Sequence, residues 1–510
     1  MSPKRVFRIA IGGPIRTIDP LEIENSGELI LVSNLAEPLL AMDPKTGLLL
    51  LSAAEKYTVS QDGLKITLSL RNDLYWSTGK KIVAQDFIYA FRRLLASSKK
   101  SSLSERFEIV KGADEFAQGA IMDPGQLGFK AMDTLTLIIE LKRPSSSFLN
   151  VLTEPGTSPI PKETVDRFGS AWVLPKNWVS SGPFIPVDKK EDLWILRKNP
   201  HHRLASTIEI DEVEVRLVDG GEEGTQLYLE GKVDQFGHRD LAVPSRRIPS
   251  LAGRNDLVFQ PDLRTYFLRL NTNRIPVSQL KIRQAFAMAV DRSLLLSGIG
   301  LDEESLAFSL VPDGIKMYEA PRGYLFSVAQ AKKILKDLGY CVVKEFSSSC
   351  RSFPYVTLIH VASDKKRKIA LMLETMIRKN LGLEGLSISA LPLDDFLKKV
   401  ASGDYVIALD DLAVLSQEPF GFLDAFRKRK ASLSGFNNPE FDELLDQAER
   451  ATNFTDSKAL FRRAEALLLR DAAVIPLFHG TNAVLISSKL KGYFSNIWDL
   501  HPFAEISLLP

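Results

Sequence analysis

Residues 70–79 read LRNDLYWSTG and residues 84–93 read AQDFIYAFRR, and these two neighbouring stretches decide the fold class. Apolar residues alternate with polar ones up to the first stretch, at Leu64, Ile66, Leu68 and Leu70. A period of two is typical of a half-buried strand, and the turn at residues 61–63 makes this strand the second arm of a hairpin. In the second stretch the apolar residues fall on one face of a helix, with Asp86 favourably placed in its first turn. A strand that leads into an amphipathic helix predicts an α/β protein.

The same two periods recur on both sides of these stretches. Strands are predicted at residues 135–141, 266–270 and 355–360, and strand-like sequence returns after residue 475. Helices are predicted at residues 29–40, 282–290, 369–381, 439–448 and 460–468. Ser278 and Asn438 are the expected N-caps of the second and fourth of these helices. The region after residue 155 is rich in Pro, Gly and Ser, which predicts a lobe boundary there.

Length and charge restrict the classes of protein that this chain can belong to. At 510 residues, two or three lobes are expected rather than one core. The 65 Lys and Arg nearly balance the 63 Asp and Glu, so no basic surface for nucleic acid is indicated, and residues 365–367 are expected to be a solvated helix end. No run of eighteen apolar residues could span a membrane, and the first eight residues lack the apolar core of a secretory signal. If the protein is exported, we expect its signal to have been removed.

The residue types of catalytic sites do not occur in the spacings that their chemistry requires. There is no nucleophile elbow, no phosphate-binding loop and no pair of histidines at helical spacing. His201 and His202 adjoin, but adjacent side chains on an extended loop point apart, so we expect surface histidines rather than a metal site. The two cysteines, Cys341 and Cys350, are compatible with free thiols or with a disulfide that closes a short loop. We therefore predict a protein that is not an enzyme and that holds no metal or cofactor.

Short motifs occur in a fixed order along nearly the whole chain. They lie at residues 18–20, 36–39, 70–93, 181–184, 231–234, 270–272, 282–292, 438–445, 464–468 and 475–477. In this order they resemble family 5 of the solute-binding proteins, the oligopeptide-binding receptors of peptide importers, and residues 70–93 are the most discriminating part. The chain departs from the family at Ile18, where Leu is usual, and at residues 36–39, where an acidic residue, Gly and Leu are usual.

The resemblance implies an α/β, two-lobed periplasmic-binding-protein fold of class II (cluster C type), with an extra α/β segment and a ligand cleft between the lobes. Residues 1–38, 155–262 and 475–510 would form the core domain of lobe 1, residues 39–154 an additional domain of lobe 1, and residues 263–474 lobe 2. Chain crossings near residues 262 and 475 would be the hinge strands. An exported protein meets an oxidising compartment, which favours the disulfide over free thiols.

In this family a peptide lies between the lobes and pairs through its backbone like an added strand. Matched without gaps, the extended segment that pairs with the peptide falls on Glu24, Asn25 and Ser26. On the facing lobe, peptide receptors commonly carry a Trp and then an Asp that holds the peptide's ammonium. These two places fall on Leu412 and Leu415, so the ammonium anchor is missing at its usual position.

Three other residues are candidates for contacts with a ligand. Asp410 and Asp411, at the end of a predicted strand, could supply a displaced negative charge, because a poorly solvated carboxylate holds an ammonium firmly; alternatively they only solvate the strand end. His479 is expected to face the cleft, as aromatic residues there do in relatives. Val400 and Leu409 stand where some relatives carry Arg, so a peptide carboxylate would need other partners.

The resemblance therefore implies an extracytoplasmic substrate-binding protein of an ABC importer, which captures oligopeptides, including modified or cell-wall-derived ones. It would be a monomer in the periplasm or anchored to the outer side of the membrane, and would deliver its ligand to a permease driven by an ATPase. One alternative is a receptor for another solute, such as glutathione, a metal chelate or a sugar. A hydrolase is the other, and the absent catalytic spacings argue against it.

Overall fold

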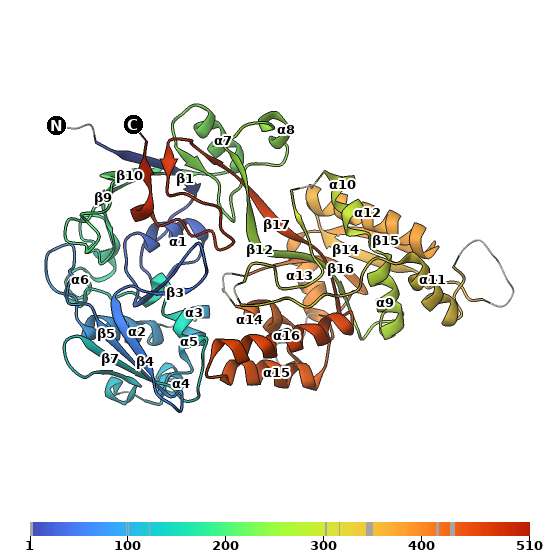
Figure 1. Cartoon of the computed structure of the whole chain (residues 1–510), viewed down its shortest axis with the longest axis horizontal. Helices are drawn as coiled ribbons and strands as arrows, with labels where there is room; N and C mark the ends of the chain where they lie inside the picture. Colours follow the sequence, from blue (N-terminus) through green and yellow to red (C-terminus); the bar gives the residue numbers. More distant parts are fainter. Residues whose placement is uncertain are drawn as a thin grey trace. The chain divides into compact units, whose positions relative to one another are not determined.

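The computed structural model describes residues 4–97, 99, 101–121, 123–300, 303–315, 317–342, 350–414, 418–428 and 434–509. The chain forms two compact units, of which unit 1 comprises Met1–Gln260 and Asn482–Pro510, and unit 2 comprises Pro261–Thr481. The chain enters unit 2 within β12 (Leu257–Leu270) and leaves it within β17 (Val474–Ile486), so both termini belong to unit 1 (Figure 1).

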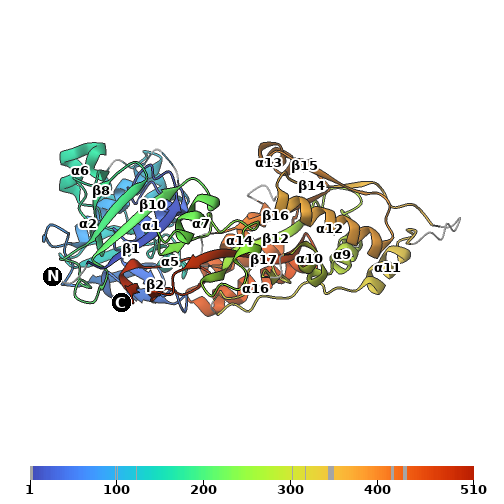
Figure 2. The ribbon, with the colours of Figure 1, turned by 90° about the horizontal axis from the view of Figure 1, so that it is seen from above.

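The larger sheet of unit 1 is built around β1 (Val6–Gly12). It pairs in parallel with β10 (Glu212–Val218) on one side and β11 (Gln235–Phe236) on the other. The antiparallel strands β9 (Leu193–Lys198) and β8 (Phe184–Lys189) follow β10, and the end of β17 pairs with β11. Figure 2 labels β1, β10 and β8 of this sheet. The chain leaves the carboxyl end of β1 at Gly12, where the loop to α1 (Ser26–Ser33) begins.

The predicted hairpin and the helix after it are confirmed. β4 (Ala54–Val59) and β5 (Lys65–Leu70) pair antiparallel, and β7 (Thr136–Glu140) and β6 (Phe129–Ala131) complete a four-stranded sheet. α2 (Ala84–Leu95) buries the predicted face, and the Asp86 carboxylate accepts the Val83 N–H at 3.0 Å in its first turn. One apolar cluster includes Ile9, Leu68 and Phe91, so the larger sheet and the four-stranded sheet of unit 1 share a core. The predicted division of lobe 1 at residues 39–154 stays a prediction.

The motifs at residues 18–20 and 181–184 stabilise unit 1. Asp19 is buried and accepts two hydrogen bonds from the Arg93 guanidinium, at 3.0 and 2.7 Å. At Gly182, a Cβ would lie 2.6 Å from the backbone of Leu35 and Ala36, so only glycine fits there. These motif residues join segments that are distant in sequence. Their role in unit 1 is therefore structural.

The sheet of unit 2 has the order β15 (Leu386–Leu391), β14 (Val356–Val361), β16 (Ile407–Ala413), β12 and β17. β14 is parallel to both neighbours, and β16 is antiparallel to β12. One face of the sheet packs on α9 (Leu280–Ala289) and α12 (Asp364–Leu381), while α15 (Pro439–Arg450) and α16 (Phe454–Arg470) lie side by side (Figure 1). This confirms the strands predicted at residues 266–270 and 355–360, and Asn438 caps α15 as predicted.

The remaining helices and strands have at most ten residues each. In unit 1 they are β2 (Leu40–Met42), β3 (Leu49–Leu51), α3 (Ser102–Phe107), α4 (Ala113–Ala117), α5 (Phe148–Val151), α6 (Lys162–Phe168), α7 (Gly221–Leu229), α8 (Ile248–Leu251), β18 (Leu490–Lys491) and β19 (Ser507–Leu508). In unit 2 they are α10 (Arg292–Ile299), β13 (Ser305–Leu306), α11 (Val328–Asp337), α13 (Leu393–Ser402) and α14 (Pro419–Leu423). None of the described helices is long and apolar enough to cross a membrane.

Two predicted helix boundaries were wrong. The helix expected at residues 29–40 ends at Ser33, because the Asn34 side chain donates to the Ile30 carbonyl at 2.8 Å and accepts the N–H of Phe503 at 2.9 Å. Ser278 does not cap α9, whose N-cap is Gln279, because the Ser278 N–H belongs to a turn closed on the Arg274 carbonyl. Both corrections depend on backbone contacts that periodicity does not report.

Two predictions about side chains were also decided. Cys341 and Cys350 form a disulfide. His202 is buried, which corrects the expected surface position: its Nε2 lies 3.0 Å from Glu37, whose carboxylate also binds Arg203 and Ser52. Burial alone would raise the pKa of Glu37, but the contacts with His202 and Arg203 hold it below its usual value. His201 is exposed, as expected.

Candidate functional site

The predicted ligand segment of unit 1, residues 24–26, lies at the start of α1. Asn25 is extended, with φ −137° and ψ 165°, and its Oδ1 accepts the Glu28 N–H at 2.8 Å as the helix N-cap. Ser26 is already the first helical residue. The segment is therefore extended only as far as Asn25, and helix geometry fixes the direction of the Ser26 side chain.

A buried carboxylate holds the loop before this segment. Glu28 has no exposed surface, and its two oxygens accept the N–H groups of Arg16, at 3.1 Å, and Glu24, at 2.8 Å. The Glu24 side chain reaches solvent and forms ion pairs with Arg16 and Lys99. Because its N–H is already bonded within unit 1, Glu24 can offer a peptide backbone its carbonyl but not its amide.

His238 connects Ser26 to the end of β1. The ring lies in the turn after β11 and is 3% exposed. Its Nε2 accepts the Gly12 N–H at 3.2 Å, and its Nδ1 lies 3.2 Å from the Ser26 hydroxyl oxygen. Burial lowers the pKa of His238, so the ring is neutral near pH 7. Sequence reasoning did not select His238, because only the fold brings it beside residue 26.

In unit 2, Asp411 near the end of β16 is held between two cations. Its carboxylate accepts from Arg264 at 2.6 Å and from Lys366 at 2.6 Å, and Arg264 also pairs with Asp262 at 3.2 Å. Burial alone would raise the pKa of Asp411, but Lys366 and Arg264 outweigh it and hold the pKa below its usual value. Asp411 is therefore ionised at neutral pH, and its charge is compensated inside unit 2.

Asp410 lies on the opposite face of β16 and binds Arg269, which is 3% exposed. Leu412, half-buried, lies opposite Thr265 of β12. Leu415 falls outside the described residues. The structure thus brings Asp410, Asp411 and Leu412 to the end of one strand, and their contact with a ligand stays a prediction.

His479 of β17 is buried in unit 2, and its contact with a ligand stays a prediction. Its Nδ1 lies 2.9 Å from the Thr265 hydroxyl, which donates its own proton to the Leu310 carbonyl at 2.7 Å. The Nδ1 must therefore carry the ring proton, and Nε2 is an acceptor with no partner among the described residues. Burial lowers the pKa of His479 to about 4, so the ring is neutral at neutral pH.

The two lysines at the start of α12 form ion pairs with carboxylates, which corrects part of the sequence interpretation, while Arg367 is exposed as expected. Lys366 binds Asp411, and Lys365 binds the buried Glu304 at 2.8 Å while it lies over the ring of Tyr266. Glu304 also accepts the N–H of Thr481 at 2.5 Å. Positive charges are unfavourable in the first turn of a helix, and that signal could have indicated carboxylate partners for these lysines, although the sequence analysis did not use it.

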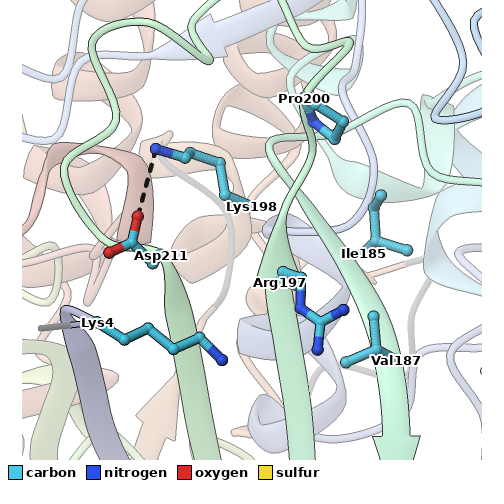
Figure 3. A pocket seen from close by; sticks show the side chains of 7 residues that line it. All are labelled: Lys4, Ile185, Val187, Arg197, Lys198, Pro200 and Asp211. Atoms are coloured by element: carbon cyan, nitrogen blue, oxygen red, sulfur yellow. Dashed lines mark ion pairs between the residues drawn. The ribbon is translucent and has the colours of Figure 1, made fainter. Parts of the chain in front are cut away.

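A depression of about 460 Å³ lies on unit 1, and no candidate residue lines it (Figure 3). It is lined by Lys4, Ile185, Val187, Arg197, Lys198, Pro200 and Asp211. Its cations already have partners, since Lys198 pairs with Asp211 at 3.7 Å and Lys4 with Glu212. We therefore do not assign the ligand site to it. No group of three His, Cys, Asp or Glu side chains within the described ranges could hold a metal ion.

Comparison with known proteins decides the family. The model of the bacterial extracellular solute-binding proteins, family 5, matches residues 50–433. The chain belongs to this family. The predicted resemblance is confirmed, and the two-lobed α/β fold is confirmed by the unliganded open form of the murein tripeptide-binding protein MppA, with a TM-score of 0.88, 24% identity and coverage of 99% of this chain and 98% of that one.

The similarity to characterised relatives extends over nearly the full length. The chain is 25% identical to the periplasmic oligopeptide-binding protein OppA of Escherichia coli, covering 94% of this chain and 88% of the relative. It is 26% identical to the murein peptide-binding protein MppA of the same organism, with the same coverage. It is also 26% identical to the probable deoxycholate-binding protein YgiS of Escherichia coli, covering 97% and 91%.

Proposed function

We propose that this family member binds short peptides outside the cytoplasm and delivers them to a membrane permease with an ATPase partner. The observation that carries the proposal is the near full-length similarity to relatives named for oligopeptide, dipeptide and murein peptide binding. A peptide offers the same backbone donors and acceptors whatever its side chains, so contacts through the main chain suit many sequences.

The candidate contacts on each unit fit different parts of a peptide. On unit 1 the carbonyl of Glu24 and the hydroxyl of Ser26 are the polar groups of the predicted segment. On unit 2 an ammonium would meet Asp411 as a third cation beside Arg264 and Lys366, since a carboxylate has about four acceptor positions. His479 Nε2 adds a neutral acceptor for an N–H group. This arrangement favours a ligand whose ammonium is shared among several weak acceptors over one held by a single free carboxylate.

A second candidate ligand is an amphipathic acid. Leu412 stands at the place where peptide receptors commonly carry the Trp, and the chain resembles the probable deoxycholate-binding protein as closely in identity as it resembles MppA. For such a ligand, the apolar surface at Leu412 would replace the ammonium anchor, and Arg264 or Lys366 would receive the acid.

The test is a thermal-shift screen with two probes, an equimolar library of tripeptides with free termini, and deoxycholate. Binding at 100 times the dissociation constant stabilises the folded state by about 2.7 kcal/mol, which raises the melting temperature by a few degrees. Stabilisation by the peptides supports the proposal, and stabilisation by deoxycholate alone replaces it with the second candidate. Hydrolysis of the peptides by the pure protein would contradict both.

The contact at Asp411 is tested with Asp411→Asn. We expect peptide affinity to fall by about 1 kcal/mol or more, the scale of a charge-assisted hydrogen bond. Asp404→Asn is the control, because it removes an exposed carboxylate of unit 2 that pairs with Lys399 and is not a candidate for ligand contact. Unchanged affinity in Asp411→Asn, with the folded state intact, would remove this residue from the site.

A further inference from the structure

His238 joins two segments of unit 1 that are far apart in sequence. Gly12 ends β1, and Ser26 begins α1, and the ring lies within 3.2 Å of a polar atom of each. The three residues form one chain of hydrogen bonds from a backbone N–H through the imidazole to a hydroxyl.

The direction of these hydrogen bonds follows from the chemistry of the Gly12 N–H. A backbone N–H can only donate, so Nε2 must present its lone pair to Gly12. A neutral imidazole with a bare Nε2 carries its proton on Nδ1, and that N–H donates to the Ser26 oxygen. The ring is neutral because its burial disfavours the charged form.

This direction determines what Ser26 can do. Its oxygen accepts from His238, so its own hydroxyl proton remains to be donated. Among the described residues none accepts that proton, and the side chain is half-buried at the surface of unit 1. Ser26 is thus fixed as a hydrogen-bond donor to a group outside the protein.

The backbone around His238 is held rigidly enough to keep this arrangement. The N–H and carbonyl of His238 bond those of Leu241, each at 3.0 Å, and the next N–H, of Arg239, donates to Asp499 at 2.7 Å. Gly237 has φ +112°, and a Cβ there would lie 2.9 Å from Val484. These contacts fix the backbone of the turn beside β17, and the ring is held within it by burial and by its two hydrogen bonds.

We propose that His238 is a positioning residue for ligand binding, which fixes Ser26 as a donor to a carbonyl or carboxylate oxygen of the ligand and disfavours an ammonium at that point. The inference rests on the proposed function, in which residues 24–26 contact the ligand, and it adds the chemistry of the group that binds there.

Two substitutions of the ring separate its two hydrogen bonds. The amide nitrogen of His238→Asn occupies the place of Nδ1 and can donate to Ser26, while the amide oxygen of His238→Gln occupies the place of Nε2 and can accept from Gly12. We expect His238→Asn to keep the affinity for the tripeptide library within about twofold. His238→Gln and Ser26→Ala should each weaken it about tenfold, the scale of one hydrogen bond. The double variant, with His238→Gln and Ser26→Ala together, should bind the tripeptide library no more weakly than either single variant, because both changes remove the same interaction.

NMR of protein labelled with ¹⁵N-histidine tests the tautomer without any ligand. We expect His238 to show a protonated Nδ1 and a bare Nε2. The opposite tautomer, full affinity in Ser26→Ala, or additive losses in the double variant would each overturn the inference. If the wild-type protein binds neither the library nor deoxycholate, the proposed function fails, and the tautomer still decides the state of His238. If only deoxycholate binds, the same variants are measured with that carboxylate.

Discussion

Glu465 of α16 allows a quantitative prediction of pH-dependent stability. The residue is fully buried, and its Oε1 accepts the N–H groups of Leu310, at 2.7 Å, and Val311, at 2.9 Å. Its Oε2 accepts from the hydroxyl of Tyr318. The carboxylate thus attaches the chain after β13 to α16 within unit 2. Burial raises the pKa of Glu465 to about 7, although these donors favour the ionised form.

The raised pKa of Glu465 determines in which direction the stability changes with pH. The folded state binds the proton more tightly than the unfolded state, in which the pKa is near 4.5. The contribution of Glu465 to stability is therefore complete below pH 4.5 and is lost as the pH rises towards 7. The shift of roughly 2.5 units corresponds to a loss of about 3 kcal/mol across that window. Glu465→Gln removes the titration and keeps an acceptor for both N–H groups, so its stability should not fall in this way.

Urea unfolding at pH 5, 6, 7 and 8 measures the difference between wild type and Glu465→Gln. All five tryptophans, Trp76, Trp172, Trp178, Trp194 and Trp498, belong to unit 1. Tryptophan fluorescence therefore reports unit 1 and serves as the internal control, while far-UV circular dichroism also reports unit 2. We expect the urea midpoint of the unit 2 transition to become increasingly higher in the variant than in the wild type as the pH rises. Equal pH dependence in the two proteins, or a shift seen by tryptophan fluorescence, would refute the reasoning.

Three further predictions concern stability. Reduction of the Cys341–Cys350 disulfide should lower the free energy of unfolding of unit 2 by about 2–3 kcal/mol, the loop entropy of a ten-residue ring, and unaltered urea midpoints with and without reductant would contradict this. Arg93→Ala should cost about 3 kcal/mol in unit 1, because it leaves a buried carboxylate unpaired, and tryptophan fluorescence in urea measures it. Gly182→Ala should destabilise unit 1 by about 1–3 kcal/mol, because its new Cβ would meet the backbone of Leu35 and Ala36, and an unchanged fluorescence midpoint would contradict the packing argument.

Much of the local structure could be predicted because local periodicity causes it. The hairpin before residue 70, the helix that carries Phe87 and Phe91, and the cap at Asn438 depend on residues within a few positions of one another. The boundary of α1 could not be predicted, because Asn34 ends the helix with the help of Phe503 from the far end of the chain.

The candidate site was less accessible to prediction for the same reason. The sequence indicated Asp410 and Asp411 as negative charges, but their partners Arg269, Arg264 and Lys366 come from another strand and a helix. His238 carried no local signal, since it is more than two hundred residues from Ser26.

The sequence by itself determined the family, the α/β elements and the charges available to bind a ligand, because these follow from residue types and their spacing. Tertiary structure alone decided which of those charges are already neutralised and which hydrogen-bond donors remain unused. Long-range pairs form only when the chain folds, and the acceptor or donor positions that a carboxylate or a hydroxyl can offer a ligand are those that such pairs leave unused.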